Sequence, residues 1–135
     1  MTAATSILLI EDSATQADQI AAQLRNYGFQ VTIAADGPDG LRAVDKSQPD
    51  VILLDINLPS MSGYQVCSRL KRDKNTAHIP IIMLTASDSS DDILRGLNVG
   101  ATDYIAKDAF AADNLITTLR SLGLLESDGE DQETG

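Results

Sequence analysis

The chain has 135 residues, of which 43% are hydrophobic and 22% charged, a composition typical of one folded domain and not of a disordered segment. Its net charge of -10 argues against a nucleic-acid-binding surface, and its single cysteine, Cys67, excludes a disulfide within the chain. No apolar run approaches the ~18 residues that a membrane span needs, and no signal peptide is visible, so we expect a cytoplasmic protein without membrane contact.

Short apolar runs alternate with amphipathic stretches along the chain. The runs predict strands at residues 7–10, 31–34, 51–54, 81–84 and 104–105, and the most continuous ones are typical of strands buried on both faces. After each run, apolar residues recur at helical spacing. The groups that mark these helices are Ile20, Leu24 and Tyr27; Leu41 and Val44; Val66 and Leu70; Ile93, Leu94 and Leu97; and Leu115, Leu119 and Leu122.

Glycine and proline agree with these boundaries. Gly28 and Gly100 stand where the first and fourth helices should end, and Pro49 and Pro80 precede the third and fourth strands. Gly40 is a weak point inside the second helix, because glycine there costs about 1 kcal/mol relative to alanine. Five strands, each followed by a helix, predict an α/β domain with a parallel sheet, right-handed crossovers and helices on both faces.

Polar residues follow the strands where each one ends. Glu11 and Asp12 follow the first strand, Asp55 the third, Thr85 the fourth and Lys107 the fifth. In folds of this class, ligands bind beyond the carboxyl ends of the strands. We therefore expect three carboxylates, one hydroxyl and one ammonium group to meet at one edge of the sheet.

Such a cluster needs positive charge, because two like charges ~4 Å apart cost about 4 kcal/mol at an effective dielectric near 20. Mg²⁺ favours oxygen ligands and often binds through one or two carboxylates and a phosphate group. Lys107 and Thr85 could contact the same phosphoryl group. Asp55 ends the central strand and is the best candidate for a nucleophile that forms an aspartyl phosphate.

With these residues, the sequence resembles the receiver domain of two-component response regulators. The motifs are Glu11-Asp12 and residues 55–63, 80–86 and 100–107, and the resemblance covers about residues 6–122. It implies a single flavodoxin-like (βα)5 domain with strand order 2-1-3-4-5. Residues 1–5 would be an N-terminal extension and residues 123–135 an acidic, flexible tail, since the last ten residues carry five acids and no base.

The resemblance also implies a function and partners. A histidine kinase or histidine phosphotransfer protein would phosphorylate Asp55, and the surface of the fourth helix, fifth strand and fifth helix would change to control a downstream protein target. The domain would act as a monomer or weak dimer that contacts neither nucleic acid nor membrane. It would not be an enzyme, apart from supporting its own phosphotransfer and slow autodephosphorylation.

Individual residue roles follow from the same resemblance. Asp12, Asp55 and the backbone carbonyl of Asn57 would hold Mg²⁺, with Mn²⁺ as a possible substitute, and Glu11 would contribute through a water molecule. Lys107 would pair with the phosphoryl group, and Thr85 would move toward it. Tyr104 would rotate inward as the switch residue.

One position departs from the family pattern. Receivers commonly have proline after the lysine, often with a cis bond, whereas Asp108 follows Lys107 here. We expect a trans bond, because a non-proline cis bond costs ~2.5–4 kcal/mol, and we consider Asp108 a candidate cap for the fifth helix. Asn57 and Ser87, two residues after Asp55 and Thr85, stand at positions that tune phosphoryl loss in this family.

Several alternatives share the architecture. A flavin mononucleotide module would need a hydroxyl- and glycine-rich loop where Glu11-Asp12 stands. An aspartate phosphatase would need an acid where Asn57 stands, together with a cap domain. A phosphorylation-independent pseudo-receiver usually lacks an acid or the lysine, and a receiver excised from a hybrid kinase or larger regulator would have this same sequence.

The remaining polar residues have structural interpretations. We expect His78 to be a surface residue and Cys67 to be a small, partly buried apolar residue on the third helix. We expect the basic run Arg69, Lys71, Arg72 and Lys74 to form a solvated face.

Overall fold

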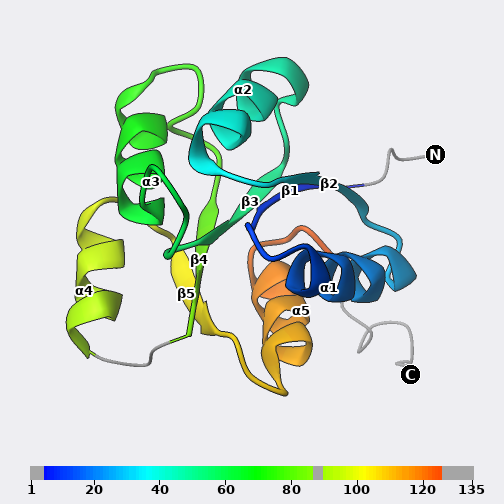
Figure 1. Ribbon diagram of the computed structural model, residues 1–135. Helices are drawn as coiled ribbons and strands as arrows, with labels where there is room; N and C mark the ends of the chain where they lie inside the picture. The colour runs from blue at the N-terminus through cyan, green and yellow to red at the C-terminus, as the bar shows by residue number, and fades with distance from the viewer. Residues whose placement is uncertain (1–4, 87–89, 126–135) are drawn as a thin grey trace.

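A computed structural model describes residues 5–86 and 90–125. Within them, strands and helices alternate along the chain, as predicted (Figure 1). The strands are β1 (Ser6–Ile10), β2 (Gln30–Ala34), β3 (Val51–Asp55), β4 (Ile81–Thr85) and β5 (Asp103–Ala106). The helices are α1 (Ala14–Asn26), α2 (Gly37–Ser47), α3 (Gly63–Arg72), α4 (Ser90–Asn98) and α5 (Ala111–Ser121).

The strands form one parallel sheet in the order β2-β1-β3-β4-β5, which confirms the expected topology. Ile10 pairs with Leu54, and Asp55 pairs with Leu84. This register brings the ends of β1, β3 and β4 level with one another. Asp55 therefore lies at the centre of the carboxyl edge of the sheet, which is where folds of this class bind their ligands.

Helices cover both faces of the sheet: α1 and α5 lie on one side, and α2, α3 and α4 on the other (Figure 1). Alternate residues of β3 face opposite layers, so that Val51 and Leu53 join the core cluster under α1 and α5 while Ile52 and Leu54 join the other. All four residues are fully buried. The continuous apolar runs in the sequence thus reflect strands with protein on both sides.

The glycines that were expected to end helices do so. Gly28 and Gly100 follow α1 and α4 with φ angles of 94° and 108°. Gly40 lies inside α2 as expected, and it has a packing role there, because a Cβ atom at this position would lie 2.4 Å from Cδ1 of Ile10. The absence of a side chain is what lets α2 approach β1 this closely.

Two predicted apolar helix faces are less buried than their spacing suggested. Tyr27 is the C-cap of α1 and remains 48% exposed. On α4, Leu94 and Leu97 are 57% and 44% exposed, although the helix itself forms where it was expected. Helical spacing identifies a helix and its apolar side, but it does not determine how much protein covers that side.

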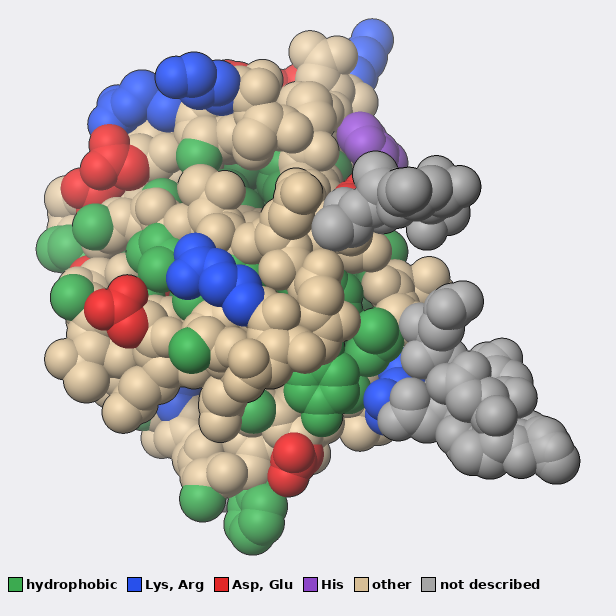
Figure 2. Space-filling model, turned by 90° about the vertical axis from the view of Figure 1, so that its right-hand side faces the viewer, with side chains coloured by type: hydrophobic (Ala, Val, Ile, Leu, Met, Phe, Trp, Pro, Cys, Tyr) green, Lys and Arg blue, Asp and Glu red, His purple; other side chains and the backbone are tan. Residues whose placement is uncertain are grey.

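The surface residues largely follow expectation. His78 is exposed and appears as the purple side chain in Figure 2, a face on which Lys and Arg form separate groups. Cys67 is fully buried. Lys71 departs from the expected solvated face, because its ammonium group donates to the carbonyls of Ala77 and Ile79 at 3.0 and 2.7 Å. It thereby fixes the loop that leads into β4.

Residues 123–125 continue from α5 along the protein surface. Leu124 and Leu125 pack against the core cluster beneath α1 and α5, and the Thr5 hydroxyl donates to the Leu124 carbonyl at 3.1 Å. Ser87 and the acidic residues 126–135 lie outside the described residues. Among the helices of the described part of the chain, none is both long enough and apolar enough to cross a membrane.

Candidate functional site

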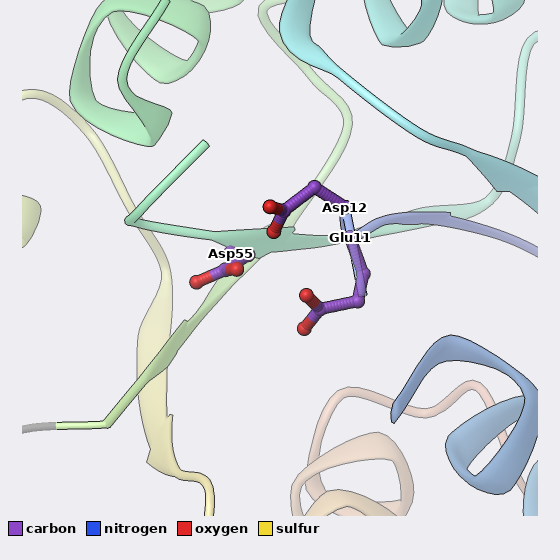
Figure 3. A group of neighbouring side chains, drawn as sticks. All are labelled: Glu11, Asp12 and Asp55. Carbon is purple, nitrogen blue, oxygen red and sulfur yellow. The ribbon is translucent and has the colours of Figure 1, made fainter. Parts of the chain in front are cut away.

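Three acidic side chains meet at the carboxyl edge of the sheet. One carboxylate oxygen from each of Glu11, Asp12 and Asp55 lies within 4.8 Å of the others, and Figure 3 shows the side chains entering the same space from β3 and from the end of β1. Glu11 and Asp55 are each only 2% exposed, whereas Asp12 is exposed. The cluster therefore has a buried floor and opens to solvent on the Asp12 side.

Glu11 is held by the backbone on both sides of it. Its N–H donates to the Ala34 carbonyl at 3.0 Å, which continues the pairing of β1 with β2. Its Oε2 accepts from the Ser13 N–H at 3.1 Å. Ser13 in turn caps α1, since its hydroxyl accepts from the Gln16 N–H. The loop that carries Glu11 and Asp12 is thus anchored by a strand before it and a capped helix after it.

Asp55 is fixed by the turn that follows β3. Its Oδ1 accepts from the Asn57 N–H at 3.1 Å, and the Ile56 N–H donates to the Leu84 carbonyl at 3.0 Å. Gly63, the first residue of α3, donates its N–H to the Ile56 carbonyl at 2.9 Å. A Cβ atom on Gly63 would lie 2.4 Å from the Asp55 carbonyl oxygen, so glycine permits this close approach.

Lys107 supplies the positive charge. Its ammonium nitrogen lies 2.6 Å from Oε1 of Glu11 and 3.1 Å from Oδ2 of Asp55, and its side chain is 16% exposed. The Lys107 N–H donates to the Thr85 carbonyl at 2.8 Å, which ties the end of β5 to the end of β4. Four side chains from three distant parts of the sequence therefore form one charged cluster.

Burial and pairing shift the ionisation of this cluster. Burial raises the pKa of Glu11 and the charge of Asp55 adds to this, while the hydrogen bonds from Lys107 and Ser13 and the charge of Lys107 offset the rise only in part. Burial alone would lower the pKa of Lys107, but hydrogen bonds to Glu11 and Asp55, together with their charges, raise it overall. Lys107 therefore stays charged at neutral pH.

The other predicted site residues lie along the same edge toward α4. Thr85 is 2% exposed and Tyr104 is 38% exposed. Both line an apolar crevice beneath α4 that has no room for a water molecule. Asn57 is exposed beside Asp55. The structure thus brings together Glu11, Asp12, Asp55 and Lys107, with the Asn57 backbone beside them, and it places Thr85 and Tyr104 together at the crevice beneath α4.

Sequence reasoning missed Gln16. Its Oε1 accepts a hydrogen bond from the Lys107 ammonium at 3.0 Å, which makes it a third partner of that group. Gln16 lies in the first turn of α1 and does not follow a strand, so no sequence signal marked it. Gln16 lies about one helical turn after the capping Ser13, and only this spacing could have suggested that Gln16 faces the site.

The bond between Lys107 and Asp108 is trans, as expected, because the described residues contain no cis peptide bond. The suggestion that Asp108 caps α5 is wrong, because the N-cap is Phe110, which makes no side-chain capping bond. The Asp108 carboxylate instead accepts from the Phe110 N–H at 2.8 Å. It stabilises the turn that leads into α5, one step before the helix begins.

The acidic cluster fits a hard divalent cation. Its donors are carboxylate oxygens, which Mg²⁺ prefers. Oε1 of Glu11 is buried, and its one contact among the described polar groups is the charge-assisted one with the Lys107 ammonium. An ion or its water could give this oxygen a further partner and offset the repulsion among the carboxylates.

Comparison with known proteins identifies the class. The response regulator receiver domain matches residues 7–120, so the chain belongs to that family and is a signalling module of two-component systems, not a conventional enzyme. The sensory transduction protein RegX3 of Mycobacterium tuberculosis is 41% identical over 94% of this chain and 53% of its own length. The DNA-binding regulator RpaA of Synechocystis is 39% identical over 86% of this chain and 48% of its own length. The chain spans about half the length of these relatives.

Solved structures agree with the fold. Vibrio cholerae chemotaxis protein CheY4 superposes with a TM-score of 0.82 and 31% identity, covering 88% of this chain and 98% of that one. The receiver domain of sensor histidine kinase PA1611 from Pseudomonas aeruginosa has a TM-score of 0.80 and 35% identity, covering 90% and 99%. In that protein a magnesium ion is coordinated in the active site cleft.

Proposed function

We propose that this receiver is a switch controlled by phosphorylation of Asp55, with the phosphohistidine of a histidine kinase or histidine phosphotransfer protein as donor. A carboxylate oxygen of Asp55 forms a bond to phosphorus while the phosphorus–nitrogen bond breaks and the imidazole leaves with its electron pair. One observation carries the proposal: the buried Asp55 carboxylate lies 3.1 Å from the Lys107 ammonium, within a cluster of three carboxylates.

Asp12, Asp55 and the backbone carbonyl of Asn57 would hold Mg²⁺, or Mn²⁺ in its place, with Glu11 contributing through a water molecule. The bound ion would supply positive charge for the phosphoryl oxygens. Support comes from the oxygen-only donor set and from the buried Oε1 of Glu11, whose one contact among the described polar groups is with Lys107. The magnesium found in the PA1611 receiver domain is consistent with this assignment.

Lys107 and Thr85 are the residues that respond to the phosphoryl group. The Lys107 ammonium would exchange its contact with the Asp55 carboxylate for one with a phosphoryl oxygen, a charge-assisted bond. Thr85 would move toward the same group. Because the crevice beneath α4 is too narrow for a water molecule, Tyr104 can turn inward only after Thr85 or α4 shifts. This steric requirement would couple phosphorylation to α4.

The surface of α4, β5 and α5 would carry the signal to a downstream protein. Exposed apolar side chains gather there: Leu94 at 57%, Leu97 at 44%, Tyr104 at 38% and, just before α5, Phe110 at 65%. Such a group favours protein contacts over nucleic-acid contacts. We propose that the domain, residues 6–122, acts through protein contacts as a monomer or weak dimer in the cytoplasm.

Loss of the phosphoryl group would be slow and intrinsic to the domain. Asn57 and Ser87 are uncharged, so neither supplies a carboxylate that could act as a general base toward an attacking water. This autodephosphorylation, together with phosphotransfer, is the only chemistry that we propose for the domain.

Intact-mass measurement with acetyl phosphate and Mg²⁺ tests the proposal. We expect the wild-type chain to gain one phosphoryl group and the Asp55→Asn variant to gain none. Asp45→Asn, a change at an exposed acid on α2, should leave labelling intact. Chelation of the metal should abolish labelling of the wild type. A mass gain that persists in Asp55→Asn would show that another residue is the acceptor.

A further inference from the structure

A groove between α3 and α4 gathers positive charge away from the acidic cluster. It encloses about 310 Å³ and is lined by Arg69 and Arg72 of α3 and Arg95 of α4. Gln65 and Ser68 add an amide and a hydroxyl to the same wall. Half of the six arginines in a chain of net charge -10 therefore line one groove.

Across residues 5–86 and 90–125, the three ion pairs include none of these arginines. The pairs join Arg42 to Asp39 and Lys107 to the acidic cluster. Arg25 also lies elsewhere, and it donates to the Val31 carbonyl at 2.8 Å. The described residues that line the groove thus include three guanidinium groups and no carboxylate, an arrangement that favours a bound anion.

Two of the arginines are already oriented. The Arg95 guanidinium lies 4.3 Å from the centroid of the Tyr64 ring, and the Tyr64 hydroxyl donates to the Asp92 carbonyl at 3.2 Å. Nε of Arg72 donates to the Ser68 carbonyl at 3.4 Å, which leaves its terminal nitrogens for other partners. Side chains that are held in place before binding lose less conformational entropy when a ligand arrives.

The shape and donors of the groove indicate the ligand class. A volume of about 310 Å³ lies at the small end of the range for small-molecule sites. A tetrahedral phosphate presents oxygens in several directions, so guanidinium groups from two helices can share one ion, whereas a planar carboxylate presents only two oxygens. The Ser68 hydroxyl is a further donor.

We propose that this groove binds a compact molecule with two or more phosphate groups, held by Arg69, Arg72 and Arg95. The site is separate from Asp55 and does not depend on phosphorylation or on Mg²⁺. Because the ligand would contact α3 and α4 together, it would fix α4 relative to the rest of the domain.

Titration of the full chain with inorganic pyrophosphate, in the presence of a chelator and without a phosphodonor, tests the site. Amide shifts in NMR spectra should change in α3 and α4 and saturate. Arg69→Ala and Arg95→Ala should each weaken binding by about tenfold, which corresponds to the loss of one charge-assisted contact. Arg95→Lys keeps the charge but loses the planar fork, and it should weaken binding as well.

Two control variants distinguish pyrophosphate binding at this groove from non-specific charge attraction and from binding at Asp55. Arg42→Ala removes the same charge from α2 and should change the affinity less than about twofold, since its effect is screened. Asp55→Asn should bind pyrophosphate as the wild type does, so failure here is distinct from failure of phosphorylation. Any of four results would overturn the proposal. Arg42→Ala could weaken pyrophosphate binding as much as the groove variants do, or the amide shifts could fail to saturate. Citrate could bind with the same affinity as pyrophosphate, or binding could appear only after removal of residues 126–135.

Discussion

Two regions that adjoin β4 are built differently: the carboxyl edge of the sheet that carries the acidic cluster, here called the site edge, and α4 with the crevice beneath it, here called the α4 region. At the site edge, Glu11 and Asp55 are each 2% exposed and their backbones continue the hydrogen bonding of the sheet. In the α4 region, Leu94 and Leu97 are about half exposed, and an apolar crevice lies beneath the helix. The difference indicates that one region holds chemical groups in place while the other can change position at low cost.

The physical reason lies in what surrounds each backbone segment. Residues at the ends of β1 and β3 have strands on both sides and helices above and below, so a displaced side chain would break several contacts at once. α4 packs next to β5, which is an edge strand of the sheet. Fewer neighbours constrain it, which suits an element whose position is to be altered by a ligand.

The largest expected effect is at Gly63. Gly63→Ala would place a Cβ atom 2.4 Å from the Asp55 carbonyl oxygen and 2.8 Å from Cα of Ile56, both of which are backbone atoms that cannot move aside easily. We expect the variant to lose at least about 3 kcal/mol of unfolding free energy, measured by urea denaturation followed by circular dichroism.

Gly96→Ala is the matched change in α4. Its Cβ atom would meet the Met83 side chain at 3.5 Å, an ordinary contact. Alanine favours a helix over glycine, so we expect a gain of about 0.5–1 kcal/mol. If the two variants had similar stabilities, the contrast between a rigid site edge and a tolerant α4 would be wrong.

The second effect concerns the charge balance of the site. Lys107→Ala would leave the carboxylates of Glu11 and Asp55 without their shared cation, and we expect a loss of at least about 2 kcal/mol in metal-free buffer. Mg²⁺ should stabilise the variant more than the wild type, because the ion would replace the missing charge. Thermal unfolding with and without Mg²⁺ measures both.

Lys46→Ala, at an exposed position on α2, is the control for this variant and should change stability by less than about 0.5 kcal/mol. An equal response of Lys107→Ala and the wild type to Mg²⁺ would argue against a metal at the acidic cluster.

A smaller effect is expected at Gln16. Gln16→Leu removes the neutral acceptor of the Lys107 ammonium, which is partly accessible to water, so we expect a loss of about 1 kcal/mol. The control is Gln19→Leu, one turn further along α1, because Gln19 and Gln16 both line a second groove, between α1 and the start of α5. Chemical denaturation of both variants measures the difference, and equal losses would mean that the Lys107 contact contributes nothing.

The smallest effect on stability at neutral pH is expected at Cys67. The reactivity of its thiol measures how often α3 and α4 separate. The Cys67 Sγ donates to the Val99 carbonyl at 3.6 Å, and burial raises the pKa of the thiol to about 11 from 9.0. At about pH 8 a thiol reagent should therefore react only when α3 and α4 separate, at least about 100-fold more slowly than with unfolded chain. Rapid native-state reaction would show that the region opens more readily than proposed.

The same pKa shift fixes the sign of a pH dependence. Between pH 9.0 and about 11, the unfolded chain loses the thiol proton while the folded chain keeps it, so stability falls as pH rises. Below this window the contribution is fully present. A Cys67→Ala variant lacks the group, and its unfolding free energy should fall less steeply over that range in urea titrations.

The sequence by itself determined the alternation of strands and helices and the residues at the carboxyl edge. Buried parallel strands require continuous apolar runs, and their carboxyl ends must meet, so Glu11, Asp12, Asp55, Thr85 and Lys107 could be grouped without coordinates. Local spacing also located α4 correctly. These features depend on periodicity and chain order, which a sequence states directly.

Only the tertiary structure decided which groups touch across elements. Gln16 reaches Lys107 across 91 positions of sequence, Gly40 is required by Ile10, and arginines from α3 and α4 share one groove. The exposure of Leu94 likewise depends on how far α4 packs over β5. Each of these depends on the distance and angle between packed elements, which are set by the volumes of many side chains together and not by any local pattern.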